Sequence, residues 1–205
     1  MSQQTTERDI PQTLADISPD VIYFLDDGFR IEYCNPAWDR FALRNGGERA
    51  LRKLVVGTNL FDAIPEATLR DFYRQVFADC AARQHAMAFD FECSSPSMHR
   101  TFRMQILPRG RGFAVVNSLR VEKPHEGRTV HPPGPRYEGV EGIVTMCAHC
   151  RHTRSADEPQ RWDWVPQYVA EPRARISHGI CPLCLAYYYQ LLPKHLRNAP
   201  APAGR

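Results

Sequence analysis

The stretch VIYFLDDGFRIEYCNPAWDRFA, from Val21 to Ala42, contains two short apolar runs separated by Asp27-Gly28. An Asp-Gly pair between two apolar runs is typical of a tight turn, so this stretch predicts a β-hairpin. Asn35 stands directly before Pro36. That order suits a helix N-cap followed by the first helical residue, so we expect a helix to leave the hairpin at this point.

Further along, ATLRDFYRQVFADCAARQ predicts a long helix, because its apolar residues recur at the three-and-four spacing of one helix face. These residues are Leu69, Phe72, Tyr73, Val76, Phe77 and Cys80. AMAFDFEC and TFRMQIL then alternate apolar with polar residues, and FAVVNSL follows a tight PRGRG connection, so three strands are expected. The order predicts an α+β fold, a five-stranded antiparallel sheet with helices on one face.

The segments SPDVIYFLDDGFRIEYCNPAWDRFA and VVGTNLFDAIP, together with the last strands, resemble a PAS domain. YCNPAWDRF is similar to the most recognisable segment of that family, and the resemblance covers about residues 16–121. It implies a sensory and interaction module that forms homodimers. It also implies a cavity between sheet and helices that holds haem, flavin, a metabolite or nothing.

The residues that would line such a cavity are Phe89, Phe102, Met104 and Asn117. Asn117 lies in the last expected strand, in register with apolar residues, so its amide needs a hydrogen bond from a ligand, a water or the backbone. His85 follows the long helix and is either a haem ligand or an ordinary loop histidine. The mid-domain cysteine motif of photoactive flavin PAS domains has no match in the sequence.

Near the C-terminus, TMCAHCRH (residues 145–152) and SHGICPLCLAYYY (residues 177–189) each hold two cysteines with two residues between them. Two such turns can aim four thiolates at one point, the arrangement of a closed structural zinc site. We therefore expect Zn²⁺ on Cys147, Cys150, Cys181 and Cys184. Such a site leaves no open position for a catalytic water.

Other interpretations of these cysteines stay open. His149 or His178 could replace one cysteine, or could hydrogen-bond a ligating sulfur. An iron–sulfur cluster and a dithiol redox switch are also compatible with the spacing. The segment from about residue 137 to 193 is short for a stable hydrophobic core, so a metal would supply much of its folding free energy.

This C-terminal segment also resembles an extension that follows PAS domains in bacterial signalling proteins, and it predicts a small zinc-ribbon-like domain. The expected organisation is a polar or helical N-terminal segment (1–15), the PAS-like domain (16–121), a proline-rich linker (122–139), the four-cysteine domain (140–193) and a flexible tail (194–205). The linker assignment rests on the four prolines and few apolar residues of VEKPHEGRTVHPPGPRYEG.

Composition sets the remaining expectations. The chain has 205 residues, a formal net charge of +3 and seven cysteines. The polar MSQQTTERDI start predicts no signal peptide and no apolar run is long enough for a membrane span, so a cytoplasmic protein without structural disulfides is expected. The small net charge does not by itself imply nucleic-acid binding.

Three functions follow from these observations. The favoured one is a bacterial-type signalling adaptor whose PAS domain binds a small ligand or protein partner and whose zinc module presents an interaction surface. Trp162, Trp164 and Tyr187–Tyr189 form either that surface or the module's own aromatic core. The second is a transcriptional regulator that contacts DNA through Arg151, Arg154, Arg161, Arg173 and Arg175, although acidic residues interleave with these arginines. The third, an enzyme, is not expected because no catalytic motif is recognisable.

Overall fold

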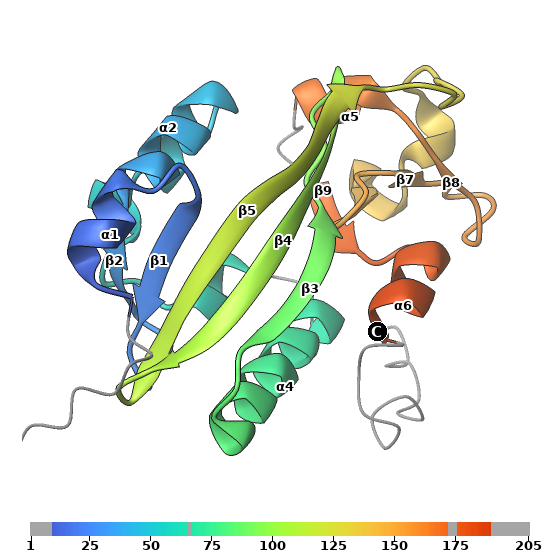
Figure 1. The fold of residues 1–205 in the computed structure, drawn as a ribbon. Helices are drawn as coiled ribbons and strands as arrows, with labels where there is room; N and C mark the ends of the chain where they lie inside the picture. Colours follow the sequence, from blue (N-terminus) through green and yellow to red (C-terminus); the bar gives the residue numbers. More distant parts are fainter. Residues whose placement is uncertain (1–9, 65–66, 172–175, 190–205) are drawn as a thin grey trace, which may run out of the picture. The chain divides into compact units, whose positions relative to one another are not determined.

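The computed structural model describes residues 10–64, 67–171 and 176–189. The chain divides into two compact units. The first unit contains residues 10–64 and 77–126, and the second contains residues 67–76 together with the described part of the chain from residue 127 onward. Each unit has a β-sheet of its own (Figure 1). None of the helices in the described ranges is both long enough and apolar enough to cross a bilayer.

The first unit is built on a five-stranded sheet in the order β2-β1-β5-β4-β3, and every neighbouring pair is antiparallel. This confirms the expected sheet. Its strands are β1 (Val21–Leu25), β2 (Ile31–Cys34), β3 (Met87–Glu92), β4 (Met98–Arg109) and β5 (Gly112–Pro124). The first and last strands of the unit therefore lie side by side at its centre. The hairpin that joins β4 to β5 turns over only two residues, because Arg109 is paired with Gly112.

Asn35 fixes the junction between the β1–β2 hairpin and the first long helix. Its side chain is fully buried, and Oδ1 accepts hydrogen bonds from the backbone N–H groups of Ile22 (3.0 Å) and Trp38 (3.2 Å). Nδ2 donates to the carbonyls of Ala15 (2.9 Å) and Asp20 (2.8 Å). The predicted N-cap is confirmed, and the same amide also ties the segment before β1 to the sheet.

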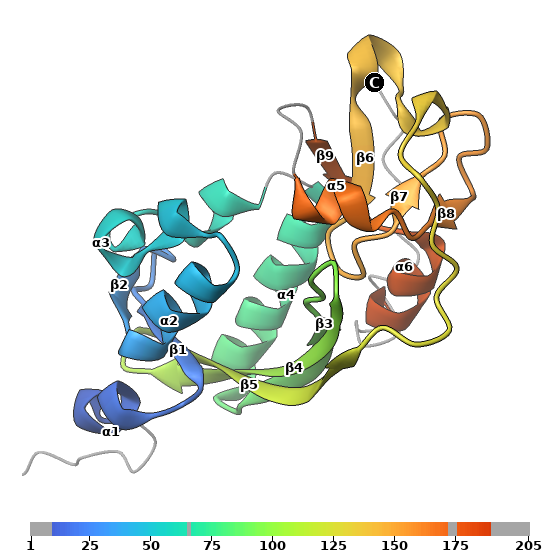
Figure 2. The same cartoon turned by 90° about the horizontal axis from the view of Figure 1, so that it is seen from above.

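The helices of the first unit lie on both faces of the sheet, so the expectation that they cover one face is wrong for α1 (Figure 2). On one face, α2 packs through Trp38 and Phe41 against Tyr23 and Phe102. The opposite face is covered at one end by α1, through Ala15. The helices are α1 (Gln12–Ile17), α2 (Pro36–Arg44), α3 (Arg52–Val55) and the part of α4 (Ala67–Arg83) from residue 77 onward, with 3₁₀ turns at Glu48–Ala50 and Leu60–Ala63.

The C-terminal half of α4 covers the same face of the sheet as α2. The Phe77 ring lies 4.9 Å from that of Phe113 on β5, and the Cys80 thiol donates to the Ile106 carbonyl on β4 at 3.4 Å. Phe29 reaches the same aromatic core from the β1–β2 turn, with its ring 5.2 Å from Phe77. Phe29 has a φ of +63°, a left-handed backbone that is rare for bulky residues and that directs the ring inward.

The second unit is a small four-stranded sheet in the order β8-β7-β6-β9. β6 and β9 are parallel, and the other two pairs are antiparallel. Its elements are β6 (Val144–Cys147), β7 (Thr153–Arg154), β8 (Trp162–Asp163), α5 (Pro166–Ala170), β9 (Ile176–Gly179) and α6 (Pro182–Tyr189), with 3₁₀ turns at Pro135–Tyr137 and Val140–Gly142. Its buried core contains Tyr137, Val144, Met146, Val165 and Tyr168.

The stretch expected to be an extended linker is more ordered than its composition suggests. β5 continues through Pro124. At the other end of the stretch, Tyr137 is 1% exposed and belongs to the core of the second unit. Prolines and glycines remove helix and strand periodicity from this stretch without preventing single residues from packing.

Candidate metal centre

The four predicted cysteines come from two segments of the second unit that are distant in the sequence. Cys147 is the last residue of β6, and Cys150 lies in the turn that follows it. Cys181 immediately precedes α6, and Cys184 lies in its first turn. The parallel pairing of β6 with β9 brings these two segments together, because Cys147 is in register with Gly179, two residues before Cys181.

The four sulfur atoms meet at one buried point. All of them lie within 4.8 Å of one another, and the Sγ atoms of Cys150 and Cys181 are 3.6 Å apart. Sulfurs bound tetrahedrally to one zinc at about 2.3 Å are separated by about 3.8 Å, so the observed spacing fits such an ion. The four residues are between 0% and 8% exposed, which keeps solvent from the point where they meet.

The first cysteine pair is held by a tight turn. The Cys147 N–H donates to the His152 carbonyl at 2.8 Å, and the Arg151 N–H donates to the Cys147 carbonyl at 3.1 Å. Arg151 has a φ of +63°, so the turn closes through a left-handed residue directly after Cys150. The Ala148 N–H donates to the Gly179 carbonyl at 2.9 Å and joins this turn to the segment that carries the second pair.

The second cysteine pair begins a helix rather than a second hairpin. The Cys184 N–H donates to the Cys181 sulfur at 3.4 Å, and the Cys181 N–H donates to the Cys147 sulfur at 3.5 Å. Backbone donors of this kind stabilise negative charge on sulfur, the form that binds a metal. The sequence suggested a turn at each cysteine pair, whereas the structure has a turn at the first pair and a helix start at the second.

Hydrogen bonds among the four thiols shift the pKa values of Cys147 and Cys150 in opposite directions. Hydrogen bonding with Cys150, Cys181 and Cys184 lowers the pKa of the Cys147 thiol. Hydrogen bonding with Cys147 and burial raise the pKa of Cys150 in return. A divalent metal would replace these shared protons, because thiols ligate as thiolates.

The two histidines of the cysteine motifs are not part of the group of ligand atoms that meets at the site, within the described chain. His149 is buried at 3% exposure, and His178 is half-buried on β9 opposite Met146. Burial, followed by the charge of Arg151, lowers the pKa of His178, so its neutral imidazole is favoured. The replacement of a cysteine by either histidine is therefore not supported by this arrangement.

The predicted cavity residues occupy one face of the first sheet. Phe89, Met104 and Asn117 form a row across β3, β4 and β5, and Phe102 lies next to Met104 on the same face. All four are buried, and this is the face that α2 contacts through Phe41. Asn117 is 9% exposed, and its Oδ1 atom is buried without a hydrogen-bond partner among the residues that the structure describes.

The remaining predicted residues are scattered. His85 is exposed in the bend after α4. Trp164 is buried at 3% exposure and Tyr187 is 52% exposed, so the aromatic residues divide between core and surface. The side chains of Tyr188 and Tyr189, and the whole of Arg173 and Arg175, lie outside the described residues. Of the arginines proposed to contact DNA, Arg161 is bound to Asp163 instead.

Asp163, one of the acidic residues that interleave with these arginines in the sequence, is a buried residue that the sequence did not single out. It is 8% exposed on β8, accepts a hydrogen bond from the Tyr137 hydroxyl at 2.8 Å, and binds the Arg161 Nε with both oxygens at 3.0 and 3.1 Å. Burial opposes its charge, yet the bonds from Tyr137 and Arg161 lower the pKa of Asp163 overall. Burial and the bond to Asp163 raise the pKa of Tyr137 to about 12. The WDW pattern around it, an acid between two tryptophans, is the sequence signal that could have revealed it.

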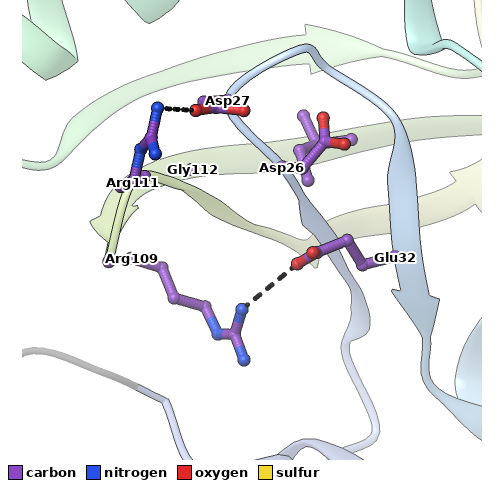
Figure 3. Close-up of a pocket in the computed structure, with 8 residues that line it drawn as sticks. Asp26, Asp27, Glu32, Arg109, Arg111 and Gly112 are labelled. Atoms are coloured by element: carbon purple, nitrogen blue, oxygen red, sulfur yellow. Dashed lines mark ion pairs between the residues drawn. The ribbon is translucent and has the colours of Figure 1, made fainter.

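A separate open pocket of about 490 Å³ lies between the tips of the two hairpins of the first unit (Figure 3). Arg111 pairs with Asp27 at 2.7 Å, and Arg109 pairs with Glu32 at 3.5 Å. The Asp26 carboxylate accepts from two backbone N–H groups of its own turn. The two ion pairs across the pocket therefore join the β4–β5 hairpin to the β1–β2 hairpin. The pocket is distinct from the sheet face on which the cavity was predicted.

Known proteins that resemble this chain were found among solved structures. No family model matches the chain, and no curated protein matches it. Solved structures that match about half of it include PAS domains. A domain of an HTR-like protein from Haloarcula marismortui is 20% identical, covers 50% of this chain and 98% of its own, and has a TM-score of 0.37.

Two further matches are a PAS domain and a photoactive yellow protein domain. The PAS domain of BvgS from Bordetella pertussis is 18% identical over 52% of this chain and 76% of its own, with a TM-score of 0.36. The photoactive yellow protein domain of the sensor histidine kinase Ppr from Rhodospirillum centenum is 16% identical over 53% of this chain and 92% of its own, also with a TM-score of 0.36. Likeness at this level carries no functional argument, so function is argued below from the chain's own residues.

Proposed function

We propose that this protein is a signalling adaptor in which the first unit senses a small ligand and the second is a zinc-stapled module that presents a rigid surface to a protein partner. The observation that carries the proposal is the convergence of four buried thiols within 4.8 Å of one another in the second unit. A closed, four-sulfur site of this kind is a device for holding structure rather than for catalysis.

Zinc is the metal that best fits this donor set. Thiolate ligands select zinc, copper(I) or iron–sulfur chemistry over magnesium or calcium, and a tetrahedral four-sulfur geometry favours zinc. The sheet around the site is small: β7 and β8 contain two residues each. Strands this short have little stability alone, so a bound zinc would supply most of the folding free energy of the unit.

The sensing role rests on the helix-facing side of the first sheet. A buried amide oxygen without a partner costs roughly 1–3 kcal/mol, so Asn117 is a place where a ligand gains by donating a hydrogen bond. Met104 is the cross-strand partner of Asn117, and the buried side chains of Phe89 and Phe102 lie on the same face of the sheet. The ligand that fits is mainly apolar and carries one N–H or O–H donor.

The partner surface that we propose lies on α6. Leu183 and Tyr187 are 78% and 52% exposed; Leu183 lies between Cys181 and Cys184, and Tyr187 lies three residues after Cys184. A helix anchored by a metal presents such side chains with little loss of conformational entropy on binding. We also propose that the protein forms a homodimer through the first unit.

Native mass spectrometry of protein purified without added metal or chelator tests these proposals together. We expect one zinc per chain, a dimer, and an organic mass that is retained by the wild type and lost in Asn117→Leu. Iron in place of zinc would overturn the assigned metal. Two results would overturn the sensing role of this face. One is that wild type and Asn117→Leu retain the organic mass equally. The other is that no mass is retained and that no compound binds from a library of mainly apolar molecules with one N–H or O–H donor.

A further inference from the structure

Residues 128–137, called the strap below, run along the second unit instead of leaving it as a free linker. The His131 N–H donates to the Trp164 carbonyl at 2.9 Å, and Val130 forms an isolated parallel bridge with Trp164. The Arg128 guanidinium lies 4.7 Å from the centre of the Trp164 ring. The Gly134 N–H donates to the Tyr168 hydroxyl at 3.1 Å. The strap is therefore bonded along its length to residues that follow β8.

Asp163 is the point at which the strap is fixed most firmly. Two strap residues reach its carboxylate: the Tyr137 hydroxyl at 2.8 Å and the His131 Nε2 at 3.7 Å. Arg161 supplies the third contact, and a third strap residue, Arg136, approaches at 3.9 Å. A carboxylate that is 8% exposed needs such partners, because an unpaired buried charge is strongly destabilising.

The position of Asp163 depends in turn on the metal-binding turn. β8 contains only Trp162 and Asp163, and it pairs with the two residues of β7, where Thr153 is in register with Asp163. Thr153 is also in register with Met146 of β6. Cys147 ends β6, and Cys150 lies in the loop that joins β6 to β7, so the proposed metal ligands close the hairpin that supports β8.

We propose that metal binding at the four cysteines and docking of the strap are coupled, so that loss of the metal releases residues 128–137 from the second unit. The coupling runs through the chain and its hydrogen bonds. The turn that carries the cysteines fixes the position of β7, and β7 fixes the position of β8 by pairing with it. Asp163 on β8 then holds His131 and Tyr137 of the strap. Only residues 125–127 separate the strap from the end of β5 at Pro124, so its release lengthens the tether between the two units. Metal occupancy then regulates the connection between the proposed sensor and the proposed partner module. This inference rests on the proposed metal centre.

The first test is hydrogen exchange followed by mass spectrometry on the full chain, before and after removal of the metal with a chelator. We expect exchange in peptides from residues 128–137 to become at least about tenfold faster, as when a hydrogen bond to a charged group is lost. Peptides from β1 and β5 are the internal control and keep their rates. Metal content is measured on the same samples. A strap that stays protected after the metal has left contradicts the coupling while leaving the metal centre intact.

The second test separates docking from the metal. Asp163→Asn keeps the shape of the side chain and removes its charge, so we expect a metal-loaded protein with a rapidly exchanging strap. Asp157→Asn makes the same charge change at an exposed position and is the matched control. A metal-loaded Asp163→Asn protein with wild-type strap protection overturns the role of Asp163. A wild type that binds no metal overturns the proposed metal centre, and the coupling with it.

Discussion

The Sγ atom of Cys150 lies 3.6 Å from the Sγ atom of Cys181, although 31 positions separate the two residues in the sequence. This contact joins a β-turn to the start of a helix, and it depends on the parallel register of β6 and β9. The fold of the second unit and its proposed metal therefore depend on each other.

Replacing Cys181 with serine tests that dependence. The variant keeps the size of the side chain and removes one thiolate, so we expect loss of the metal and unfolding of the second unit, since a structural zinc contributes on the order of 10 kcal/mol to such a domain. Metal analysis and limited proteolysis measure the two effects. Cys93→Ser, a half-buried thiol in the first unit, is the control that keeps both properties.

Asn35→Ala is expected to destabilise the first unit by about 2–4 kcal/mol, because it leaves the buried backbone N–H of Ile22 without its acceptor and removes the side-chain donor to the carbonyls of Ala15 and Asp20. Urea unfolding followed by tryptophan fluorescence gives the free energy. Asn45→Ala changes the same type of side chain at an exposed position and should cost clearly less. Equal effects of the two variants would show that Asn35 is no more than a helix cap.

Asn117→Leu is expected to raise the stability of the ligand-free first unit by about 1–3 kcal/mol, because it removes a buried acceptor that has no partner among the described residues. Chemical denaturation of ligand-free protein measures it. Gln105→Leu, on the other face of the sheet, is the comparison and should stay within about 0.5 kcal/mol of wild type. A destabilised Asn117→Leu variant would mean that the amide is already satisfied.

Gly112→Ala should disrupt the pairing of β1 with β5. A Cβ atom at residue 112 would lie 2.0 Å from the Leu25 carbonyl oxygen, and a backbone atom cannot give way as a side chain can. We expect a loss of several kcal/mol, on the order of a severe overpacking mutation. Gly134→Ala, where nothing lies within 4 Å of the added methyl, serves as the control in thermal unfolding. Similar melting temperatures for the two would contradict the close approach.

Cys34 gives the first unit a dependence on alkaline pH. Burial, with a smaller contribution from the charge of Asp39, raises the pKa of this thiol from its ordinary value of 9.0 to about 12. The unfolded thiol ionises first as pH rises, so the stability present below pH 9 is lost progressively between about pH 9 and 12. Urea midpoints at pH 8 and pH 10 should differ more in wild type than in Cys34→Ala. Equal differences would contradict the raised pKa.

The parts of the structure that were predicted are those with local sequence signals. Asn35 before Pro36 identified the helix cap, the alternating strands identified the five-stranded sheet, and the cysteine spacing identified the four cysteines that meet. Each of these predictions was built from short local patterns in the sequence.

The parts that were missed depend on long-range packing. Tyr137 lies in a proline-rich stretch, and its packing in the core and its contact with Asp163 show that the stretch belongs to the second unit. The helix after Cys181 and the face covered by α1 likewise follow from contacts between distant segments. The burial of Asp163 was missed because a count of charged residues does not distinguish a buried carboxylate from an exposed one.

The most direct test of the metal centre is elemental analysis of the full chain purified without chelator, combined with limited proteolysis before and after metal removal. The metal centre predicts one zinc per chain and a second unit that becomes protease-sensitive only when the zinc is removed. A second unit that is equally resistant with no metal bound would contradict it.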